Sequence, residues 1–453
     1  MNPTVVLRDD ARAIWQAGMD AVDSSRLVRS AVRRTSDSLD ICDHRIPLAG
    51  LGRVAVVGAG KAGARMAAAV EDAVGEDILE EKLFGWINVP ADCVESLRKI
   101  HLHAARPPGL NEPTETGVEG SLKILKIISE LGLDDLCLVL LSGGGSALLP
   151  APISEITLED KQTVTRLLMQ RAATINELNC VRKRLSLIKG GNLARAAKAG
   201  TVLALIISDV VHDPLDTIAS GPTVADPSTA ADALAVLHKY ATNLDDTPKS
   251  VLDYLISKAR NPEPDLPIPR NVHNYIIGNN AVALNAAASK ARKLGYPVHS
   301  LGSDNQGEAH EVGRTLAEMC VATRDRGDPI SPPACLLSGG EPVVHLTETD
   351  ELRKGGRNQE VVLAGLERLW DAGMHGIVLL SGGTDGEDGP TDAAGAFVDQ
   401  QVLETARSRC LTPDSYLAIN NSYEFFDLTN GLLKTGPTHT NVMDLRVALI
   451  DTE

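Results

Sequence analysis

Six strand-like apolar runs place the strongest constraint on the fold of this chain. Most of them end in a glycine turn, and they alternate with longer segments of helical spacing, with helices expected over 61–75 and 157–176. Runs such as Val54 to Val57 are apolar at every position, as in strands covered on both faces. This alternation predicts an α/β protein with parallel sheets. The runs lie at 53–60, 136–145, 201–210, 273–280, 334–341 and 376–386.

A proline-rich stretch near the middle of the chain suggests how these elements are divided. The segment 243–271 closes with four prolines, at positions 262, 264, 267 and 269. This composition breaks helices and favours an extended linker. We therefore expect a first domain over residues 1–245 and a second over residues 270–453, each long enough to form its own sheet.

Charge and composition exclude several classes of partner. The 453 residues include 60 acidic and 44 basic side chains, a net charge of −16, which repels a nucleic-acid backbone. Aromatic residues make up 3%, too few for base-stacking platforms or membrane belts. No stretch approaches the ~18 uninterrupted apolar residues of a membrane helix, and the seven cysteines show no CxxC pair. We expect a cytoplasmic protein with reduced thiols and small-molecule ligands.

The glycine turns are the first candidate binding sites. Leu-Leu-Ser-Gly-Gly occurs at 140–144, 336–340 and 379–383, each time after a strand-like run. Glycines there let backbone N–H groups approach an anion, at the strand ends where ligands of open α/β sheets collect. The richest turn, at 142–146, suits a nucleotide phosphate or a small carboxylate. The alternative is that these glycines only form tight turns.

The turn from Gly58 to Gly63 matches GxGxxG between a strand and a helix, a pattern typical of dinucleotide binding. Asp92 is the only acidic residue near the position expected to hold the ribose. Lys61 lies inside the turn, where the helix dipole disfavours a cation, so an anionic ligand is expected to offset its charge. We favour substrate binding by Lys61, with a solvated lysine as the alternative.

Further basic residues gather in an otherwise acidic chain. The segment 182–192 contains Arg182, Lys183, Arg184 and Lys189. A solvated helix face is the ordinary explanation, but Lys189 directly precedes two glycines. Arg357 lies in Gly-Gly-Arg-Asn-Gln-Glu, and its planar fork of donors can grip carboxylate or phosphate oxygens in pairs.

Acidic residues follow three of the runs. Mg²⁺ is usually held by one or two carboxylates on turns together with substrate phosphates. The GxSxG, HExxH, EF-hand, Walker A and protein-kinase patterns are absent, so phosphoryl transfer would need another architecture. The acidic residues that follow the runs are Asp209, Asp213, Glu341, Asp385, Glu387, Asp388 and Asp392.

Eight segments in order along the chain resemble the glycerate 2-kinases of the MOFRL class, two-domain α/β enzymes that phosphorylate the 2-hydroxyl of D-glycerate from ATP. The resemblance runs from about residue 10 to the C-terminus. The segments are VVGAGKAGARMA (56–67), LVLLSGGGSALLPAP (138–152), LIKGGNLA (187–194), LIISDVVHDPLDTIASGPTVAD (205–226), LLSGGEPVV (336–344), GGRNQE (355–360), LLSGGTDGEDGPTDAAGA (379–396) and TGPTHTNVMDL (435–445).

This resemblance implies a Rossmann-like N-terminal domain, a C-terminal MOFRL domain and an active site in the cleft between them. It also implies that Lys61 and Arg357 are the catalytic pair. The sequence departs from the family at two positions, since His212 and His439 stand where glycine is common. Related sequences have also been labelled hydroxypyruvate reductases.

We therefore expect an ATP-dependent D-glycerate 2-kinase in which Lys61 and Arg357 close on the glycerate carboxylate and the transferring phosphoryl group. Asp209 would accept the hydroxyl proton or hold Mg²⁺ through water, and Asp385 and Glu341 are the alternatives and the candidate Mg²⁺ ligands. Substrate or phosphate binding is assigned to Gly60, Ser142, Gly143, Gly144, Gly145, Ser146, Lys189 and Asn358.

Two other functions fit parts of the pattern. The GxGxxG turn also suits an NAD(P)H-dependent hydroxypyruvate reductase, and a regulator that binds a nucleotide or a sugar acid without turnover would use similar residues. The sequence leaves the assembly open, with a homodimer as one alternative.

Overall fold

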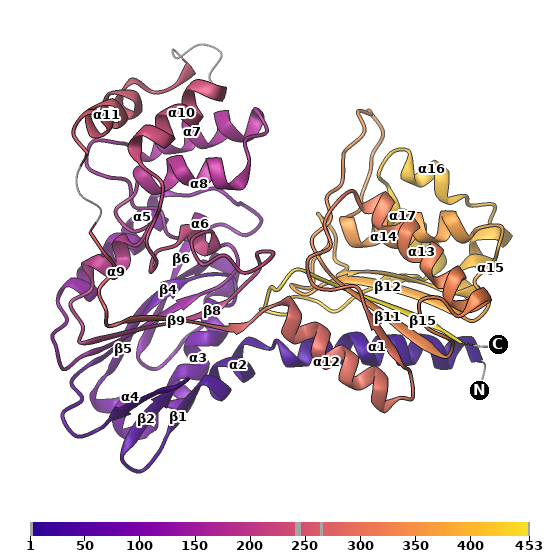
Figure 1. The fold of residues 1–453 in the computed structure, drawn as a ribbon, viewed down its shortest axis with the longest axis horizontal. Helices are drawn as coiled ribbons and strands as arrows, with labels where there is room; N and C mark the ends of the chain where they lie inside the picture. The colour runs from indigo at the N-terminus through magenta and orange to yellow at the C-terminus, as the bar shows by residue number, and fades with distance from the viewer. Residues whose placement is uncertain (1–2, 241–245, 263–265, 452–453) are drawn as a thin grey trace. The chain divides into compact units, whose positions relative to one another are not determined.

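Two six-stranded sheets, each in its own unit of the chain, organise the structure (Figure 1). The computed structural model describes residues 3–240, 246–262 and 266–451. The N-terminal unit consists of residues 24–277, and the C-terminal unit combines residues 1–23 with 278–453. Both units have helices beside their sheets, which confirms the predicted α/β class.

The sheet of the N-terminal unit contains the predicted parallel strands. Its strand order is β6-β5-β4-β7-β8-β9, and the strands from β6 through β8 pair in parallel. The central strands are buried along their whole length, as their uninterrupted apolar sequences predict. The strands are β4 (Val54–Ala59), β5 (Leu83–Pro90), β6 (Ile100–Arg106), β7 (Leu136–Leu141), β8 (Thr201–Ile207) and β9 (Val272–Gly278).

Helices cover both faces of this sheet. The core between the strands and α5 (Glu115–Ser129) includes Ile124 and Ile128, and α3 (Gly63–Ala73) lies on the opposite face (Figure 1). The remaining elements near the sheet are α2 (Ser24–Ala31), β1 (Val32–Arg34), β2 (Ser38–Ile41), β3 (His44–Pro47), α4 (Glu76–Glu81), η1 (Ala91–Cys93), α6 (Gly145–Leu148), α9 (Asn192–Ala196) and η2 (Ile218–Ser220).

Four helices of the N-terminal unit form a separate layer with its own apolar core (Figure 1). The helix predicted over 157–176 ends at Gln170, and a new helix begins at Ile175, because Thr174 and Glu177 form a capping box. The four helices are α7 (Leu158–Gln170), α8 (Ile175–Arg184), α10 (Ala230–Tyr240) and α11 (Lys249–Arg260).

The sheet of the C-terminal unit is mixed, so the prediction of parallel sheets was wrong for this half of the chain. Its strand order is β10-β11-β15-β12-β13-β14. The last strand enters between β11 and β12 and runs antiparallel to both. The strands are β10 (Val298–Ser300), β11 (Ala334–Gly340), β12 (Ile377–Gly383), β13 (Gly395–Val398), β14 (Leu432–Leu433) and β15 (Asp444–Ile450).

Two pairs of helices enclose this second sheet. Helices α1 (Pro3–Ala21) and α12 (Asn280–Lys293) lie on one face, and α13 (Ala309–Arg326) and α14 (Arg357–Leu369) lie on the other (Figure 1). Ile14 and Trp15 of α1 are buried in the core of this unit. The short helices α15 (Gln400–Ser408), α16 (Pro413–Leu417) and α17 (Ser422–Thr429) complete it.

The units have different bounds from the predicted domains. Helix α1 belongs to the C-terminal unit, and β9 joins the first sheet, so the chain passes between units near Asp23 and again near Gly278. Within the proline-rich segment 243–271, α11 is a helix whose Val251 and Leu255 are buried against its neighbours. Residues 243–245 and 263–265 of that segment, including Pro264, lie outside the described residues.

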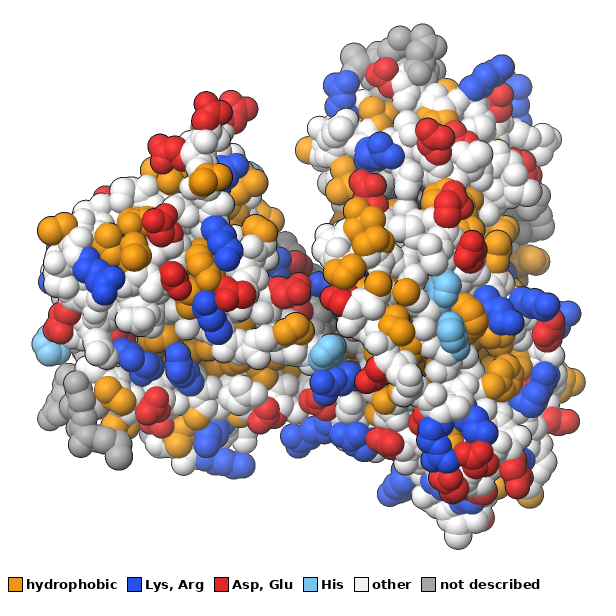
Figure 2. All heavy atoms as spheres, turned by 180° about the vertical axis from the view of Figure 1, so that it is seen from behind, with side chains coloured by type: hydrophobic (Ala, Val, Ile, Leu, Met, Phe, Trp, Pro, Cys, Tyr) orange, Lys and Arg blue, Asp and Glu red, His pale blue; other side chains and the backbone are white. Residues whose placement is uncertain are grey.

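Side chains of both charges are exposed on the surface. Figure 2 shows Lys and Arg side chains interspersed with Asp and Glu over the visible face of each unit. Among the described helices, none is long and apolar enough to cross a membrane. All seven cysteines lie within the described residues, and no disulfide joins them.

The two histidines that replace the family's glycines adopt backbone conformations that favour glycine. The φ angle is +64° at His212 and +57° at His439. A side chain with a Cβ costs about 1–2 kcal/mol in this left-handed region. The loops therefore keep the glycine-like backbone although the residue has changed.

We predict that His212→Gly raises the stability of the N-terminal unit. Relief of the left-handed strain, less the extra chain entropy of glycine, gives about 0.5–1 kcal/mol, or about 1–3 °C in the unfolding midpoint. Differential scanning calorimetry measures this shift. His238→Gly is the control, because His238 is exposed on α10 of the same unit and lacks a positive φ, so the midpoint of this variant should fall. A lower midpoint for His212→Gly would contradict the prediction.

Candidate functional site

Three predicted site segments share one edge of the first sheet. Strands β4, β7 and β8 are adjacent and parallel. Their carboxyl ends therefore bring Lys61, the turn 142–146 and Asp209 to the same side of the N-terminal unit. Asp209 is half-buried in the turn that follows β8.

The turns after β4 and β7 are bonded directly to each other. The Lys61 amide donates to the Gly143 carbonyl at 2.8 Å, and the Ala62 amide donates to Ser142 Oγ at 3.1 Å. Gly60 has a φ of +151°, and a Cβ built there would lie 1.9 Å from Ser142 Oγ. Only glycine permits this approach, so Gly60 has a packing role between the two turns.

The amides of the GxGxxG turn are already used within the protein. Gly60 N–H donates to the Asn88 carbonyl, and Gly63 N–H donates to the Gly60 carbonyl. With the bonds made by Lys61 and Ala62, the four consecutive amides at 60–63 are all satisfied. In a dinucleotide-binding turn, amides at the start of the helix face the pyrophosphate. Here the amides at 60–63 are bonded within the protein instead.

A buried arginine that sequence reasoning missed lies beside the second turn. A Cβ built at Gly144 would lie 3.3 Å from Arg106 Nη2 and 3.6 Å from Lys61 Cγ. Arg106 ends β6 and donates to Asn111 Oδ1 at 2.9 Å. Gly144 thus lies between two cationic side chains. No sequence pattern indicated Arg106, because the strand that carries it has mixed polarity.

The basic segment 182–192 is not a solvated face. Lys189 is buried, and its Nζ donates to the carbonyl and hydroxyl oxygens of Ser146 at 2.7 and 3.0 Å. Arg182 Nη2 also donates to Ser146 Oγ, at 2.6 Å. Lys183 is buried and pairs with Asp216 and Asp226. The predicted Lys189 and Ser146 therefore meet, and Arg182 joins them.

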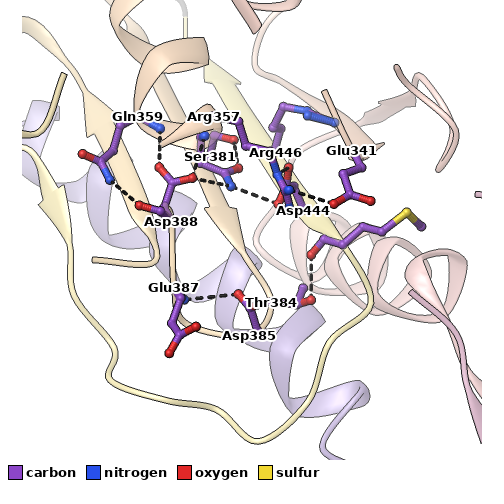
Figure 3. A network of polar contacts seen from close by, with 12 residues as sticks. Glu341, Arg357, Gln359, Ser381, Thr384, Asp385, Glu387, Asp388, Asp444 and Arg446 are labelled. Carbon is purple, nitrogen blue, oxygen red and sulfur yellow. Dashed lines mark hydrogen bonds and ion pairs between the residues drawn. The ribbon is translucent and has the colours of Figure 1, made fainter. Parts of the chain in front are cut away.

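In the C-terminal unit, the antiparallel entry of β15 assembles the second group of predicted residues. Asp444 begins this strand and lies opposite Gly340 of β11 and Gly383 of β12. Its carboxylate therefore reaches the edge where the turns bearing Glu341 and Asp385 begin (Figure 3). Sequence reasoning missed Asp444, because an acid at the start of a buried strand shows neither its direction nor its neighbours.

Arg357 is held in place by two carboxylates. It is the first residue of α14, and its Nε and Nη2 donate to the two Asp444 oxygens at 2.8 and 3.1 Å. Its Nη1 donates to Glu341 Oε1 at 2.7 Å (Figure 3). These bonds fix the guanidinium plane and use three of its five N–H groups, so two donors remain to receive an anion.

Neighbouring charges shift the pKa values of Arg357 and Glu341. Burial lowers the pKa of Arg357, but Asp444 and Glu341 outweigh that effect and hold it above its ordinary value. Burial raises the pKa of Glu341 against the opposing effect of Arg357, and the nearby charges of Asp444 and Asp385 raise it further. Arg446 is buried beside this group and interacts with Asp444 and Arg357, so two arginines share these carboxylates.

Asn358, which stays a predicted substrate-binding residue, also positions the acids. Its side chain is buried, and its Nδ2 donates to Asp444 Oδ1 at 2.9 Å and to Asp388 Oδ1 at 3.3 Å. The side-chain oxygen Oδ1 of Asn358 accepts a hydrogen bond from Ser381 Oγ at 2.6 Å. Asp388 in turn caps α14, accepting from the backbone amides of Asn358 and Gln359 at 2.9 and 2.8 Å.

The ligands available for a metal ion are two carboxylates rather than a complete coordination shell. In the described part of the chain, no group of three or more His, Cys, Asp or Glu side chains is arranged to hold a metal. Glu341 and Asp385 lie close enough for their charges to interact. Because Mg²⁺ often takes one or two carboxylates and completes its shell with substrate phosphates and water, these residues fit an ion that arrives with a nucleotide.

The chain matches two family descriptions. Residues 10–256 match a domain of unknown function, DUF4147, and residues 334–444 match the MOFRL family. Together they cover both groups of predicted site residues. The first match also extends through α11, which agrees with the placement of that helix in the N-terminal unit.

The chain is similar to proteins from several organisms over nearly its whole length. A "Putative hydroxypyruvate reductase" of Agrobacterium vitis is 40% identical, covering 94% of this chain and 93% of that protein. A "Glycerate 2-kinase" of Pyrococcus horikoshii is 36% identical, covering 95% and 94%. A crystal structure of a glycerate kinase from Thermotoga maritima is 35% identical, with a TM-score of 0.83 over 98% of this chain and 99% of that one.

We predict that Asp388→Asn flattens the pH dependence of stability. Burial raises the pKa of Asp388 to about 7, whereas the unfolded value is about 3.9. Between these values the folded state holds an extra proton, so the free energy of unfolding falls as pH rises, by at most ~1.4 kcal/mol per pH unit. Urea unfolding from pH 4.5 to 8 should show a smaller fall for the variant.

Asp392→Asn is the matched control for this experiment. Asp392 is in the same loop, and Tyr423 and Lys434 lower its pKa to about 2. Its substitution should leave the slope between pH 5 and 7 as in the wild type. Parallel stability curves for Asp388→Asn and the wild type would show that the Asp388 carboxyl does not titrate in this range.

Proposed function

The chain belongs to the MOFRL family of glycerate kinases, and we propose that it is an ATP-dependent kinase that phosphorylates the 2-hydroxyl of D-glycerate. The observation that carries this proposal is the way Arg357 is held by its neighbours. Asp444 and Glu341 fix its guanidinium while two N–H groups remain for oxygen atoms of a ligand. A carboxylate or a phosphoryl group fits this pair of donors.

Phosphoryl transfer depends on alignment and charge neutralisation more than on covalent help. In the proposed reaction, the oxygen of the glycerate 2-hydroxyl bonds to the γ-phosphorus of ATP, the bond to the β,γ-bridging oxygen breaks, and ADP leaves. The hydroxyl proton passes to a carboxylate. Arg357 and Lys61 would carry the positive charge that stabilises the transferring group and the glycerate carboxylate.

We propose Asp209 as the proton acceptor because it is half-buried at the same sheet edge as Lys61. Gly143 and Gly144 would line the approach to Lys61, while Ser142 and Gly145 hold the turn. Since Lys61 and Arg357 lie in different units, turnover would require both units to engage one substrate. The location of the active site between the units stays a prediction.

ATP is the phosphate donor expected for a kinase of this family. Mg²⁺, when bound, would neutralise phosphate charge during transfer, and Glu341 and Asp385 are the residues that would hold it. The proximity of these two carboxylates supports this assignment, since a cation would relieve their mutual repulsion. The cytoplasmic location and the homodimer also stay predictions.

A hydroxypyruvate reductase is the competing activity, favoured by the name of the Agrobacterium relative. The four satisfied amides at 60–63 argue against it, since these donors of the GxGxxG turn are already used within the protein. The kinase names of the Pyrococcus and Thermotoga proteins also support phosphoryl transfer.

A coupled ADP-release assay tests the activity. We expect ADP release that requires D-glycerate, ATP and Mg²⁺ together, with L-glycerate as the stereochemical control, and ³¹P NMR should place the new ester on C2. The same preparation should not oxidise NAD(P)H with hydroxypyruvate when ATP is absent. NAD(P)H oxidation would favour the reductase, and binding heat without turnover would favour a regulator.

We predict that Arg357→Ala lowers kcat/KM at least ~100-fold, because it removes about 2.7 kcal/mol of transition-state stabilisation. Arg357→Lys keeps a positive charge beside the buried Asp444, so this variant should still fold. Its activity therefore separates an effect on catalysis from an effect on folding. It should also lose most activity, since lysine lacks the planar fork. The control is Arg368→Ala on the same helix, where an exposed pair with Glu318 is removed. Near-normal activity of Arg357→Lys and Arg357→Ala would remove Arg357 from the mechanism.

A further inference from the structure

A buried lysine without a partner lies in the helical layer of the N-terminal unit. Lys161 is 6% exposed, and among the residues that the structure describes its Nζ has no hydrogen-bond partner. It occupies the buried face of α7 together with Val164 and Leu168. An ammonium group removed from water without a partner is costly, so its position calls for a ligand or a function.

Two more cations lie near this ammonium. Arg182 of α8 and Lys189 both donate to Ser146, as described above. Burial, and then the positive charge of Arg182, lowers the pKa of Lys161 to about 7. The pKa of Lys189 is also lowered, by burial first and then by the charges of Arg182 and Lys161. The three basic side chains therefore lie near enough to interact and form one cluster.

The cluster contains no carboxylate among the described residues, in contrast to the other cations of the same segment. Lys183 has Asp216 and Asp226 at 3.3 and 3.5 Å, and Arg184 has Asp226 at 2.7 Å. The partners of Arg182 and Lys189 are instead uncharged oxygens of Ser146. The fold thus neutralises one side of α8 and leaves the other side positive.

Strained backbone supports the hydroxyl at the centre of the cluster. Ser146 Oγ lies 2.8 Å from Ser220 Oγ, and Ser220 Oγ donates to Asn179 Oδ1 at 3.0 Å. Ala219 and Ser220 have φ angles of +50° and +61°, a conformation that costs roughly 1–3 kcal/mol per residue. Such strain is retained where surrounding contacts fix a side chain in one place.

We propose that Lys161, Arg182 and Lys189 form an anion site around the Ser146 hydroxyl, and that it binds the polyphosphate chain of the nucleotide substrate. The assignment of the anion to a nucleotide rests on the proposed kinase function. Three basic side chains suit more negative charge than that of a glycerate carboxylate. A bound triphosphate, with three to four charges at pH 7, would favour the protonated forms of Lys161 and Lys189. Ser146 and Arg182 are partly exposed, so the ligand would enter from their side.

Binding of tripolyphosphate and of ATP to the full chain, measured by calorimetry without glycerate, tests the site apart from turnover. The wild type should bind both in competition. Lys161→Met should weaken both at least ~10-fold, because one charged contact is lost, while Lys161→Arg should restore part of the affinity. Arg166→Met is the control, since Arg166 is exposed on the same helix and carries the same charge; its affinities should stay within about twofold.

Lys161→Met is expected to fold, because the native Nζ has no hydrogen bond to lose. Without ligand its unfolding midpoint should equal or exceed that of the wild type, and the stabilisation by tripolyphosphate should disappear. Lys161→Gln serves the same comparison if the methionine variant does not fold. Unchanged tripolyphosphate affinity in the folded variant would overturn the site, and so would equal affinity for inorganic phosphate and tripolyphosphate.

Steady-state kinetics separate this inference from the proposed function. In the kinase assay, Lys161→Met should raise the KM for ATP at least ~10-fold and leave the KM for D-glycerate within about twofold. If tripolyphosphate binding depends on Lys161 but no ADP is released with D-glycerate, the site stands and the proposed function fails. If turnover occurs and the variant keeps the wild-type KM for ATP, the function stands and the site fails.

Discussion

The pairing of Arg357 with the buried Asp444 carboxylate is the interaction on which the C-terminal site depends. Asp444 is fully buried at the start of β15, and a carboxylate there requires a cation and hydrogen-bond donors. Arg357 and Asn358 supply them from the first turn of α14, and Asp388 holds that turn from the opposite side. Each of these side chains is therefore held by hydrogen bonds to another one. As a result, the two remaining N–H groups of Arg357 keep a defined direction.

The two units handle buried charge in different ways. Around Arg357, the neighbouring carboxylates of Glu341 and Asp385 lie close enough for their charges to repel each other, which suits a site completed by a metal ion and a substrate. Around Ser146, three cations meet with no described acid beside them, which suits a highly charged anion. An enzyme that transfers phosphate between two anionic molecules needs both kinds of environment, since charge must be neutralised as the reactants approach. The net charge of −16 shows neither of these local environments.

Much of the fold followed from local sequence patterns. Runs that are apolar at every position became strands at nearly the predicted residues, because burial on both faces leaves no polar position in such a strand. The turns bearing Lys61, Ser142 and Glu341 follow those strands as expected. The interpretation of 243–271 as a linker missed α11, because its prolines lie after the helix and do not interrupt it. Helix α1 was not assigned to the C-terminal unit, since no local signal shows which sheet a helix will cover.

By itself, the sequence determined the fold class, the family and the two residues most expected to act, because strand periodicity and ordered motifs are properties of neighbouring residues. Only the tertiary structure decided that β15 enters between β11 and β12 and delivers Asp444 to Arg357. It also decided that Lys161, on a helix predicted only for its apolar face, shares a buried cluster with Arg182 and Lys189. Strand order and burial arise from contacts between segments far apart in the chain, and those contacts determine which charges must be paired and which remain available to a ligand.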